Sequence, residues 1–285
     1  MHYYILAFSG LNLALLTYES EQKLEKFQGV KASLRGKIFT AFVVGETSKP
    51  EFKTNKILEI LPINLTPIQS ELATFISRYY TCELGISINL FEPNDSSLES
   101  YIYNKQDFTI APNLNKRQQE ALEFINNRKI SLIFGDTGSG KSEIYIAKIR
   151  EILNAGAQAL FLMPEISLTP QMQKRLESFF GEAVAVWHSK ITPKKKEQIL
   201  KNIKSGKARL IAGARSALFL PLEKLKLIII DEEHDDSYKN TGSKPHYNAR
   251  DLALFLTSKF DLQVVLGSAT PSLTSFYKQE CFRLK

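Results

Sequence analysis

The spacing of apolar and polar residues divides the chain into parts with different patterns. In residues 1–60, short apolar runs alternate with turn residues and predict β-strands: YYILAF, LNLALLTY and GVKASLRGKIFTAFVVGE. Ser9-Gly10 predicts the turn between the first two strands, and Pro67 predicts the first turn of a helix through SELATFISRYYTCEL. Residues 1–91 are therefore expected to form a small, mostly β domain with a helix.

The pattern changes after residue 91. Residues 92–113 are polar and loosely patterned, which is typical of a linker. From residue 114, helical stretches alternate with short apolar runs of the kind found in buried strands: KISLIF, AQALFLM, AVAVW, ARLIAG, KLKLIII and LQVVLG. This alternation predicts an α/β domain over residues 114–285, with a parallel sheet covered by helices on both faces.

A glycine-rich segment, GDTGSGKS, lies at residues 135–142, between the run KISLIF and the helix after it. It matches G-x-x-x-x-G-K-[ST], the pattern of the P-loop, in which backbone N–H groups at a helix N-terminus surround nucleotide phosphates. Lys141 is expected to reach the β- and γ-phosphates of ATP, and Ser142 to ligate Mg²⁺. The residues expected to bind ATP here are Gly135, Asp136, Thr137, Gly138, Ser139, Gly140, Lys141 and Ser142.

Two carboxylates follow the run KLKLIII. Asp231 is expected at the strand edge that faces the phosphates, where it would hold Mg²⁺. Glu232 would orient and deprotonate the water that attacks the γ-phosphate. We therefore expect Lys141, Asp231 and Glu232 to be catalytic; for a lone Asp-Glu pair, an acidic surface turn would be the alternative.

Further segments resemble those of superfamily 2 helicases. FLMPEISLTPQ, GARSALFLPL, DEEHDDSYK, YNARD and GSATPS occur in the order seen in the PriA family of primosomal helicases (primosomal protein N′), which restart stalled replication forks. The resemblance is close over residues 114–285. It is weak over residues 1–90, where it rests on LALLTYES and the VKASLRGK…FVV pair. It implies a RecA-like P-loop helicase lobe preceded by a module that holds the 3′ end of a DNA strand.

The same resemblance implies residues that bind nucleotide and DNA. Gln118, in LNKRQQ, would read the adenine. The segment DEEH, residues 231–234, resembles the acid box of these helicases, and the loop after it would contact DNA by base stacking and phosphate pairing. The candidate DNA contacts of this loop are Tyr238, Lys239, His246, Tyr247 and Arg250. Arg215 is a candidate contact to the DNA backbone, and Ser268 and Thr270 would link the nucleotide state to DNA binding. The alternative for this loop is a flexible basic segment with Tyr247 packed beneath it.

Composition adds limited constraints. A net charge of +7 and a pI near 9.2 make an anionic partner plausible. Cys82 and Cys281 are far apart in sequence, which fits a reducing cytoplasm and excludes a four-cysteine zinc site within these residues. No apolar run is long enough for a membrane helix. We therefore expect a cytoplasmic protein that does not enter membranes.

Together these features predict an ATP- and Mg²⁺-dependent DNA helicase, translocating 3′ to 5′ by resemblance. Its partners would be forks, single-stranded DNA, 3′ ends, primosome proteins and single-strand-binding proteins. The second motor lobe, its arginine finger and a zinc-binding insertion are expected beyond residue 285, so these 285 residues should hydrolyse ATP poorly. Two alternatives stay open: another superfamily 2 translocase acting on DNA or RNA, and a fork-binding scaffold with nucleotide as a structural ligand.

Overall fold

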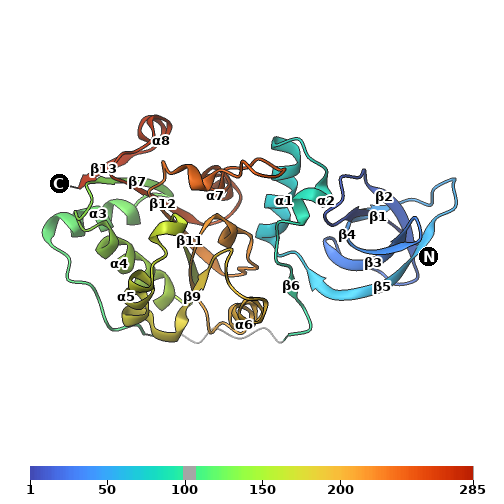
Figure 1. The fold of residues 1–285 in the computed structure, drawn as a ribbon, viewed down its shortest axis with the longest axis horizontal. Coiled ribbons are helices and arrows are strands. Elements are labelled where there is room, and N and C mark those ends of the chain that lie inside the picture. The colour runs from blue at the N-terminus through green and yellow to red at the C-terminus, as the bar shows by residue number, and fades with distance from the viewer. Residues whose placement is uncertain (99–106, 285) are drawn as a thin grey trace. The chain divides into compact units, whose positions relative to one another are not determined.

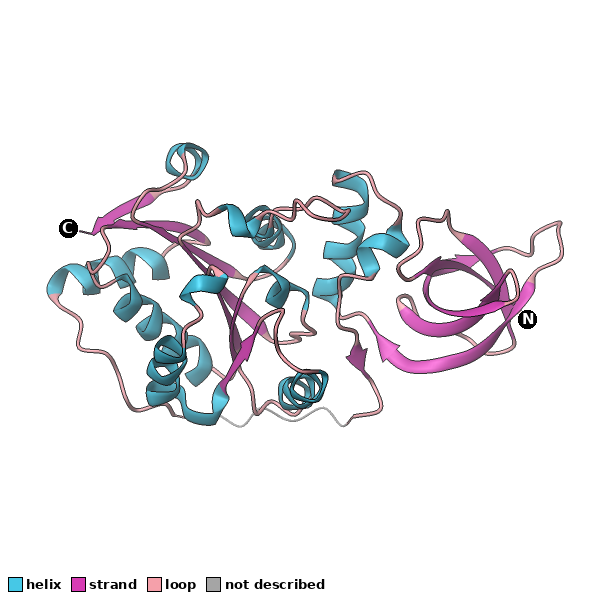
Figure 2. Ribbon diagram, in the orientation of Figure 1, coloured by secondary structure: helices cyan, strands magenta, loops and turns pink. Residues whose placement is uncertain are grey.

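The chain divides into two compact units (Figures 1 and 2). The structure, a computed structural model, describes residues 1–98 and 107–284. The first unit comprises Met1–Glu99 with two short segments from later in the chain, Phe219–Pro221 and Asn240–Tyr247, and the second comprises the remainder. Part of the predicted linker, residues 99–106, lies outside the described residues. No described helix combines the length and apolar character needed to cross a membrane.

The first unit is built on a six-stranded sheet in the order β2-β1-β4-β3-β5-β6. Neighbouring strands are antiparallel, and a further parallel pairing between β2 and β5 joins the two sides of the sheet. The strands are β1 (His2–Phe8), β2 (Leu16–Ser20), β3 (Gln28–Leu34), β4 (Lys37–Thr47), β5 (Asn55–Asn64) and β6 (Asn94–Asp95).

Two details of this unit differ from the sequence prediction. The second strand begins at Leu16, so residues 9–15 form a longer connection than a turn at Ser9-Gly10. Leu11 and Leu13 in this connection pack against the core without joining the sheet, which explains why the apolar run looked like a strand. The strand β6 lies within the segment predicted as linker and pairs with the end of β5.

Helix α1 (Pro67–Tyr79) begins where Pro67 predicted, and α2 (Leu84–Ile88) follows it. Thr66 caps α1 by accepting a hydrogen bond from the backbone N–H of Gln69, and the Gln69 side chain accepts one from the N–H of Thr66. The Gln69 amide also donates to the carbonyls of Glu92 at 2.7 Å and Phe219 at 2.9 Å. One buried side chain therefore ties the start of α1 to the two segments beside it.

The second unit contains a seven-stranded, fully parallel sheet in the order β13-β7-β12-β11-β8-β10-β9. The predicted parallel α/β fold is confirmed, because each of the six predicted runs forms a strand. A seventh strand, which the sequence analysis missed, completes one edge. The strands are β7 (Ile130–Gly135), β8 (Gln158–Leu162), β9 (Val184–Trp187), β10 (Leu210–Gly213), β11 (Leu225–Asp231), β12 (Gln263–Ser268) and β13 (Cys281–Leu284).

Helices and short 3₁₀ segments connect these strands. Helix α4 packs on β8 and β11, and α7 packs on β12. The helices are α3 (Lys116–Asn126), α4 (Lys141–Asn154), α5 (Pro170–Phe180), α6 (Pro193–Lys204), α7 (Ala249–Lys259) and α8 (Leu273–Lys278). The 3₁₀ segments are η1 (Glu165–Ser167), η2 (Gly181–Ala183), η3 (Arg215–Phe219) and η4 (Asp236–Tyr238).

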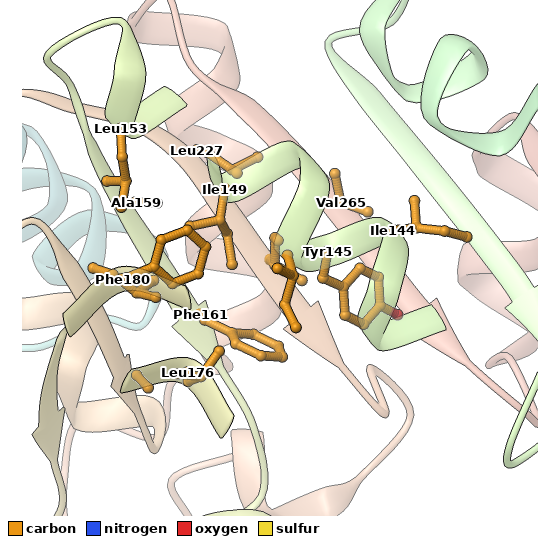
Figure 3. Packing of buried hydrophobic residues seen from close by; sticks show 14 of the residues in the cluster. Ile144, Tyr145, Ile149, Leu153, Ala159, Phe161, Leu176, Phe180, Leu227 and Val265 are labelled. Carbon is orange, nitrogen blue, oxygen red and sulfur yellow. The ribbon is translucent and has the colours of Figure 1, made fainter. Parts of the chain in front are cut away.

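The core of the second unit lies between α4 and the middle of the sheet. Figure 3 shows Tyr145 and Ile149 of α4 lying beside Phe161, Leu227 and Val265 of three strands. Alternate strand residues on the opposite face are equally buried, so the sheet is covered on both sides. Because the strands are parallel, the segments that follow β7, β11 and β12 leave the sheet at the same edge, and the candidate site is built there.

Candidate functional site

The P-loop connects β7 to α4, and its backbone depends on glycine. Gly138 and Gly140 have φ of +83° and +88°, a region that side chains other than glycine rarely adopt. At Gly140 a Cβ atom would also overlap the side-chain amide of Gln118. Asp136 and Thr137 are exposed, and Ser142 lies half-buried in the first turn of α4. Within the described residues, the Ser139 hydroxyl is one of few buried polar atoms without a hydrogen-bond partner. These features fit a cradle for phosphate.

Lys141 begins α4 and is 7% exposed. Its ammonium donates to the carbonyl of Gly135 at 2.6 Å and lies 3.4 Å from that of Asp136. It also lies 4.0 Å from a carboxylate oxygen of Glu232. The structure therefore brings the predicted phosphate lysine and the predicted general base to the same point, although β7 and β11 are distant in sequence.

The acid box begins at the last residue of β11. Asp231 accepts a hydrogen bond from the Tyr145 hydroxyl at 3.2 Å. Burial and the adjacent Glu232 carboxylate raise the pKa of Asp231 above its usual value, opposed by the charge of Lys141. Glu232 has φ of +48°, in the left-handed region that Glu disfavours. A carboxylate pair beside a lysine and a helix N-terminus could hold a divalent cation, which would offset the negative charge of nucleotide phosphates.

His234 links the acid box to the segment after β12. One ring nitrogen lies 2.8 Å from the Ser268 hydroxyl and the other lies 3.2 Å from the Thr270 hydroxyl. Ser268 also accepts a hydrogen bond from the N–H of Thr270 at 2.9 Å. The structure therefore brings the two predicted residues of GSATPS into contact with the acid box. No role for His234 could be predicted from the sequence.

Tyr145 was not identified from the sequence. It lies one helical turn after Lys141, and burial raises the pKa of its hydroxyl well above the ordinary value. Its hydroxyl occupies the space where a Cβ at Gly267 would stand. The glycine of GSATPS is thus required by a tyrosine on another element. The sequence did contain one indication of its place, because a residue four positions after Lys141 in a helix lies on the same helical face as Lys141.

Gln118 lies against the P-loop. Its side-chain oxygen accepts from the N–H of Asn115 at 2.8 Å, which caps α3, and its amide donates to the carbonyl of Gly140 at 3.3 Å. Both polar ends of Gln118 are therefore engaged by protein groups. This position is beside the phosphate cradle, and the predicted adenine contact stays a prediction.

Two aromatic residues of the loop after the acid box are buried, which corrects the expectation of base stacking. Tyr238 is 1% exposed, and its hydroxyl donates to the carbonyl of Asp231 at 2.5 Å. Tyr247 is 5% exposed, with its ring centre 5.0 Å from that of Phe219. Neither ring presents a face to a nucleic acid in this structure. The packed alternative for Tyr247 describes it better.

The basic residues of the loop are placed differently. Lys239 is exposed and pairs with Asp236 at 2.7 Å, and this interaction lowers the pKa of Asp236. His246 is also exposed, with a ring nitrogen 3.2 Å from the carbonyl of Asn240. Both side chains are accessible to a polyanion. Arg250 is instead bonded to Glu233 at 2.9 Å and largely buried, so it is engaged inside the protein.

A hollow of about 450 Å³ lies beside Arg215. Its lining comes from residues 164–166, from residues 214–216, and from Ser189, Asp235 and Ser237. Arg215 donates to the carbonyls of Ser237 at 2.8 Å and Lys239 at 2.9 Å, which fixes the loop after the acid box against the segment after β10. The predicted backbone-contact residue thus lines an open groove while it positions that loop.

Comparison with known proteins agrees with this geometry. Residues 115–278 match the family model of the DEAD/DEAH box helicases. The chain is 45% identical over 276 residues to the replication restart protein PriA of Helicobacter pylori, covering 97% of this chain and 44% of that protein. It is 39% identical over 251 residues to the replication restart protein PriA of Rickettsia felis, covering 87% and 38%. The chain therefore spans less than half the length of these curated relatives.

Among solved structures, RecG bound to a three-way DNA junction aligns with a TM-score of 0.47 and 22% identity, covering 62% of this chain and 24% of that chain. This score is too low to add to the assignment, which rests on the family model and the curated relatives. The chain belongs to the DEAD/DEAH box helicase family, and it is similar along nearly all of its length to replication restart proteins of the PriA type.

Proposed function

We propose that this chain is the nucleotide-binding part of an ATP-dependent DNA helicase that restarts stalled replication forks. The observation that supports this most strongly is the convergence of Lys141 and Glu232 at 4.0 Å, with His234 joining the same acid box to Ser268. A helicase needs its hydrolytic residues connected to the residues that sense the nucleic acid. The contact between Lys141 and Glu232 would serve hydrolysis, and the contact between His234 and Ser268 would supply the connection to nucleic-acid binding.

In the proposed site, each residue has a defined task. The N–H groups of residues 135–142 and the start of α4 bind the phosphates, and Lys141 places its charge on the β- and γ-phosphates. Bound Mg²⁺ would neutralise charge on the phosphates, with Ser142 and Asp231 holding it. Glu232 would orient the attacking water and accept its proton.

The wider assignments follow the family resemblance. We propose 3′-to-5′ translocation, a cytoplasmic location, and action on branched forks with primosome and single-strand-binding proteins. Residues 1–91 would bind the 3′ end of a strand, and residues 92–113 would connect them to the lobe formed by 114–285. The exposed Lys239 and His246 are the loop residues best placed to meet DNA phosphates.

Lys141→Ala tests the nucleotide site. A charge-assisted hydrogen bond contributes roughly 1.5–3 kcal/mol, so the affinity of this chain for a fluorescent ATP analogue with Mg²⁺ should fall about 10- to 150-fold. Lys201→Ala is the matched control, because Lys201 is an exposed lysine of α6 paired with Glu197. Equal affinities in wild type and Lys141→Ala would rule out the proposed phosphate site.

We further propose that these 285 residues alone hydrolyse ATP slowly. An arginine that reaches the γ-phosphate contributes roughly 10³ to 10⁵ in rate. The candidate arginines of the lobe already bind other protein groups: Arg175 pairs with Glu143, Arg250 pairs with Glu233, and Arg215 donates to two backbone carbonyls. Phosphate release should stay near background with and without single-stranded DNA. Strong DNA-stimulated turnover by the monomeric chain would contradict this, and Arg→Gln variants would then identify the arginine.

A further inference from the structure

Glu233 is the acid-box residue to which the proposed chemistry assigns no task. Its side chain is 0% exposed. One carboxylate oxygen accepts from the guanidinium of Arg250 at 2.9 Å and from the hydroxyls of Ser272 at 3.1 Å and Ser275 at 2.7 Å. The other oxygen accepts from the backbone N–H of Ser272 at 2.7 Å. These four donors compensate the buried negative charge, which would cost free energy if it were left unpaired.

These contacts join three parts of the lobe. Glu233 follows β11, Arg250 lies in the first turn of α7, and Ser272 is the N-cap of α8. The backbone N–H of Glu233 also donates to the carbonyl of Gly267 in β12 at 3.0 Å. Arg250 donates to the Ser272 hydroxyl as well, at 3.1 Å, so Glu233, Arg250 and Ser272 are each bonded to the other two. These three residues and Ser275, which donates to Glu233, are called the Glu233 cluster below.

The Glu233 cluster lies next to a strained residue. Glu232 has a left-handed backbone, which persists only where the surrounding structure fixes it. Asp231 on one side belongs to β11, and Glu233 on the other side is held by the cluster. The direction in which Glu232 projects is therefore fixed at both neighbours. A displacement of α7 or α8 would reach Glu232 through the Glu233 carboxylate.

We propose that Glu233 is a positioning residue for ATP hydrolysis. Through Arg250 and Ser272 it holds the backbone of the acid box so that Glu232 faces the phosphate site, and it makes that orientation depend on the placement of α7 and α8. The positioning role rests on the proposed function of Glu232. The link between the acid box and α8 does not depend on that function, because it follows from the hydrogen bonds of Glu233 to Ser272 and Ser275.

The first experiment tests the link in this chain by hydrogen exchange. Glu233→Gln keeps the size of the side chain but removes the charge and places an NH₂ group among donors. Exchange should accelerate about 10-fold or more both at residues 231–235 and at 268–276, because a charge-assisted bond contributes over 1.4 kcal/mol. Ser275→Ala removes one donor and should give a smaller change in the same two segments. Glu197→Gln, at an exposed Glu paired with Lys201, should change neither segment.

The second experiment tests positioning in the full-length protein. Glu233→Gln should lower kcat for DNA-stimulated ATP hydrolysis about 10-fold or more while KM for ATP stays within about twofold, because the phosphate cradle is untouched. Arg250→Gln should behave alike, and the double variant should be no worse than either single one, as expected for one cluster.

The outcomes separate the two proposals. The link would be overturned if, in both Glu233→Gln and Ser275→Ala, hydrogen exchange changed at residue 233 alone and stayed unchanged in the rest of residues 231–235 and in residues 268–276. A parallel loss of nucleotide affinity would overturn positioning, because it would indicate general damage to the lobe. If the wild-type protein does not hydrolyse ATP, the proposed function fails, and the exchange experiment still decides whether Glu233 connects the acid box to α8.

Discussion

At the scale of single residues, Glu232 is held in a backbone conformation that its own side chain disfavours. Its φ is +48°, and a non-glycine residue in the left-handed region costs roughly 1–2 kcal/mol. Its carboxylate is also next to that of Asp231, whose pKa is raised by burial and by this neighbour. Such strain is common where a side chain must point at a reacting group.

Glu232→Asn should therefore make the protein more stable and inactive in hydrolysis. Asn tolerates the left-handed region better than Glu does, so the free energy of unfolding should rise by about 0.5–1 kcal/mol. Glu232→Gln is the control, because it removes the same charge and keeps the backbone strain. Chemical denaturation of the three chains measures the difference. Equal stability of the Asn and Gln variants would show that the backbone at this position is not strained.

Predictability from sequence differed sharply among residues. The positions of Lys141 at the start of α4 and Asp231 at the end of β11 could be predicted, because the P-loop pattern and the apolar run before Asp231 fix the neighbouring elements. Glu233 and Tyr145 could not be given roles, because their partners come from distant segments that only the fold brings together. Tyr238 was placed wrongly because an aromatic residue in a polar loop gives no signal that it turns inward.

At the scale of elements, α4 and β12 meet so closely that glycine is needed. The Tyr145 hydroxyl fills the position of a Cβ at Gly267 and also donates to Asp231. The contact places the start of α4's second turn against the end of β12 that carries Ser268. The spacing between α4 and the GSATPS segment is therefore set by the side chain of Tyr145.

Gly267→Ala should destabilise the lobe by about 1–3 kcal/mol, the usual effect of overpacking a filled core. Tyr145→Phe in the same chain should recover part of the loss, because it removes the overlapping oxygen. The ring carbon that carried the oxygen would still be 2.8 Å from the new methyl group, so recovery should be incomplete. Gly242→Ala, at a position with no heavy atom within 4 Å, is the control. Thermal denaturation would decide; unchanged melting in Gly267→Ala would refute the contact.

The element prediction was strong where apolar runs were long and weak at the ends. Six buried runs became β7 to β12, because a strand covered on both faces must be apolar throughout. Strand β13 was missed because CFRL is short and has Arg283 in its middle. The start of β2 was predicted too early, because Leu11 and Leu13 pack against the core without pairing with a neighbouring strand.

At the scale of the whole molecule, the first unit is not a continuous piece of chain. It includes residues 219–221 and 240–247, which a pattern read along the sequence assigns to the lobe. Within this unit Phe219 packs edge-on against Phe91 and Tyr247, with ring centres 5.0 Å apart in each pair. Gln69 adds a hydrogen bond to the Phe219 carbonyl. Composition at residues 92–113 could not reveal this, because the contacts of Phe219 with Phe91 and Gln69 join residues more than a hundred positions apart.

A chain that begins at residue 107 should therefore be less stable than the same residues in the whole chain. Phe219 would lose Phe91 and Gln69, and uncovering one large apolar side chain costs about 1.5–3 kcal/mol. The melting temperature of the shortened chain should fall, and binding of a hydrophobic dye should rise. Gln69→Leu in the whole chain removes the side-chain hydrogen bonds to Phe219, Glu92 and Thr66 but leaves Phe91 packed on Phe219, so it should also lower the melting temperature. Melting of the shortened chain at the temperature of the lobe in the whole chain would contradict this.

The interrupted first unit has a consequence for how such proteins can recombine. Exchanging N-terminal modules between relatives by a single crossover in residues 92–113 would replace Phe91 and Gln69, the partners of Phe219, but would leave residues 219–221 and 240–247 of the same unit unchanged. A working chimera would need three transplants: residues 1–99, 219–221 and 240–247. Because residues 240–247 lie in the sequence between the acid box and Arg250, a new N-terminal module would have to be matched by changes in the loop that follows the acid box.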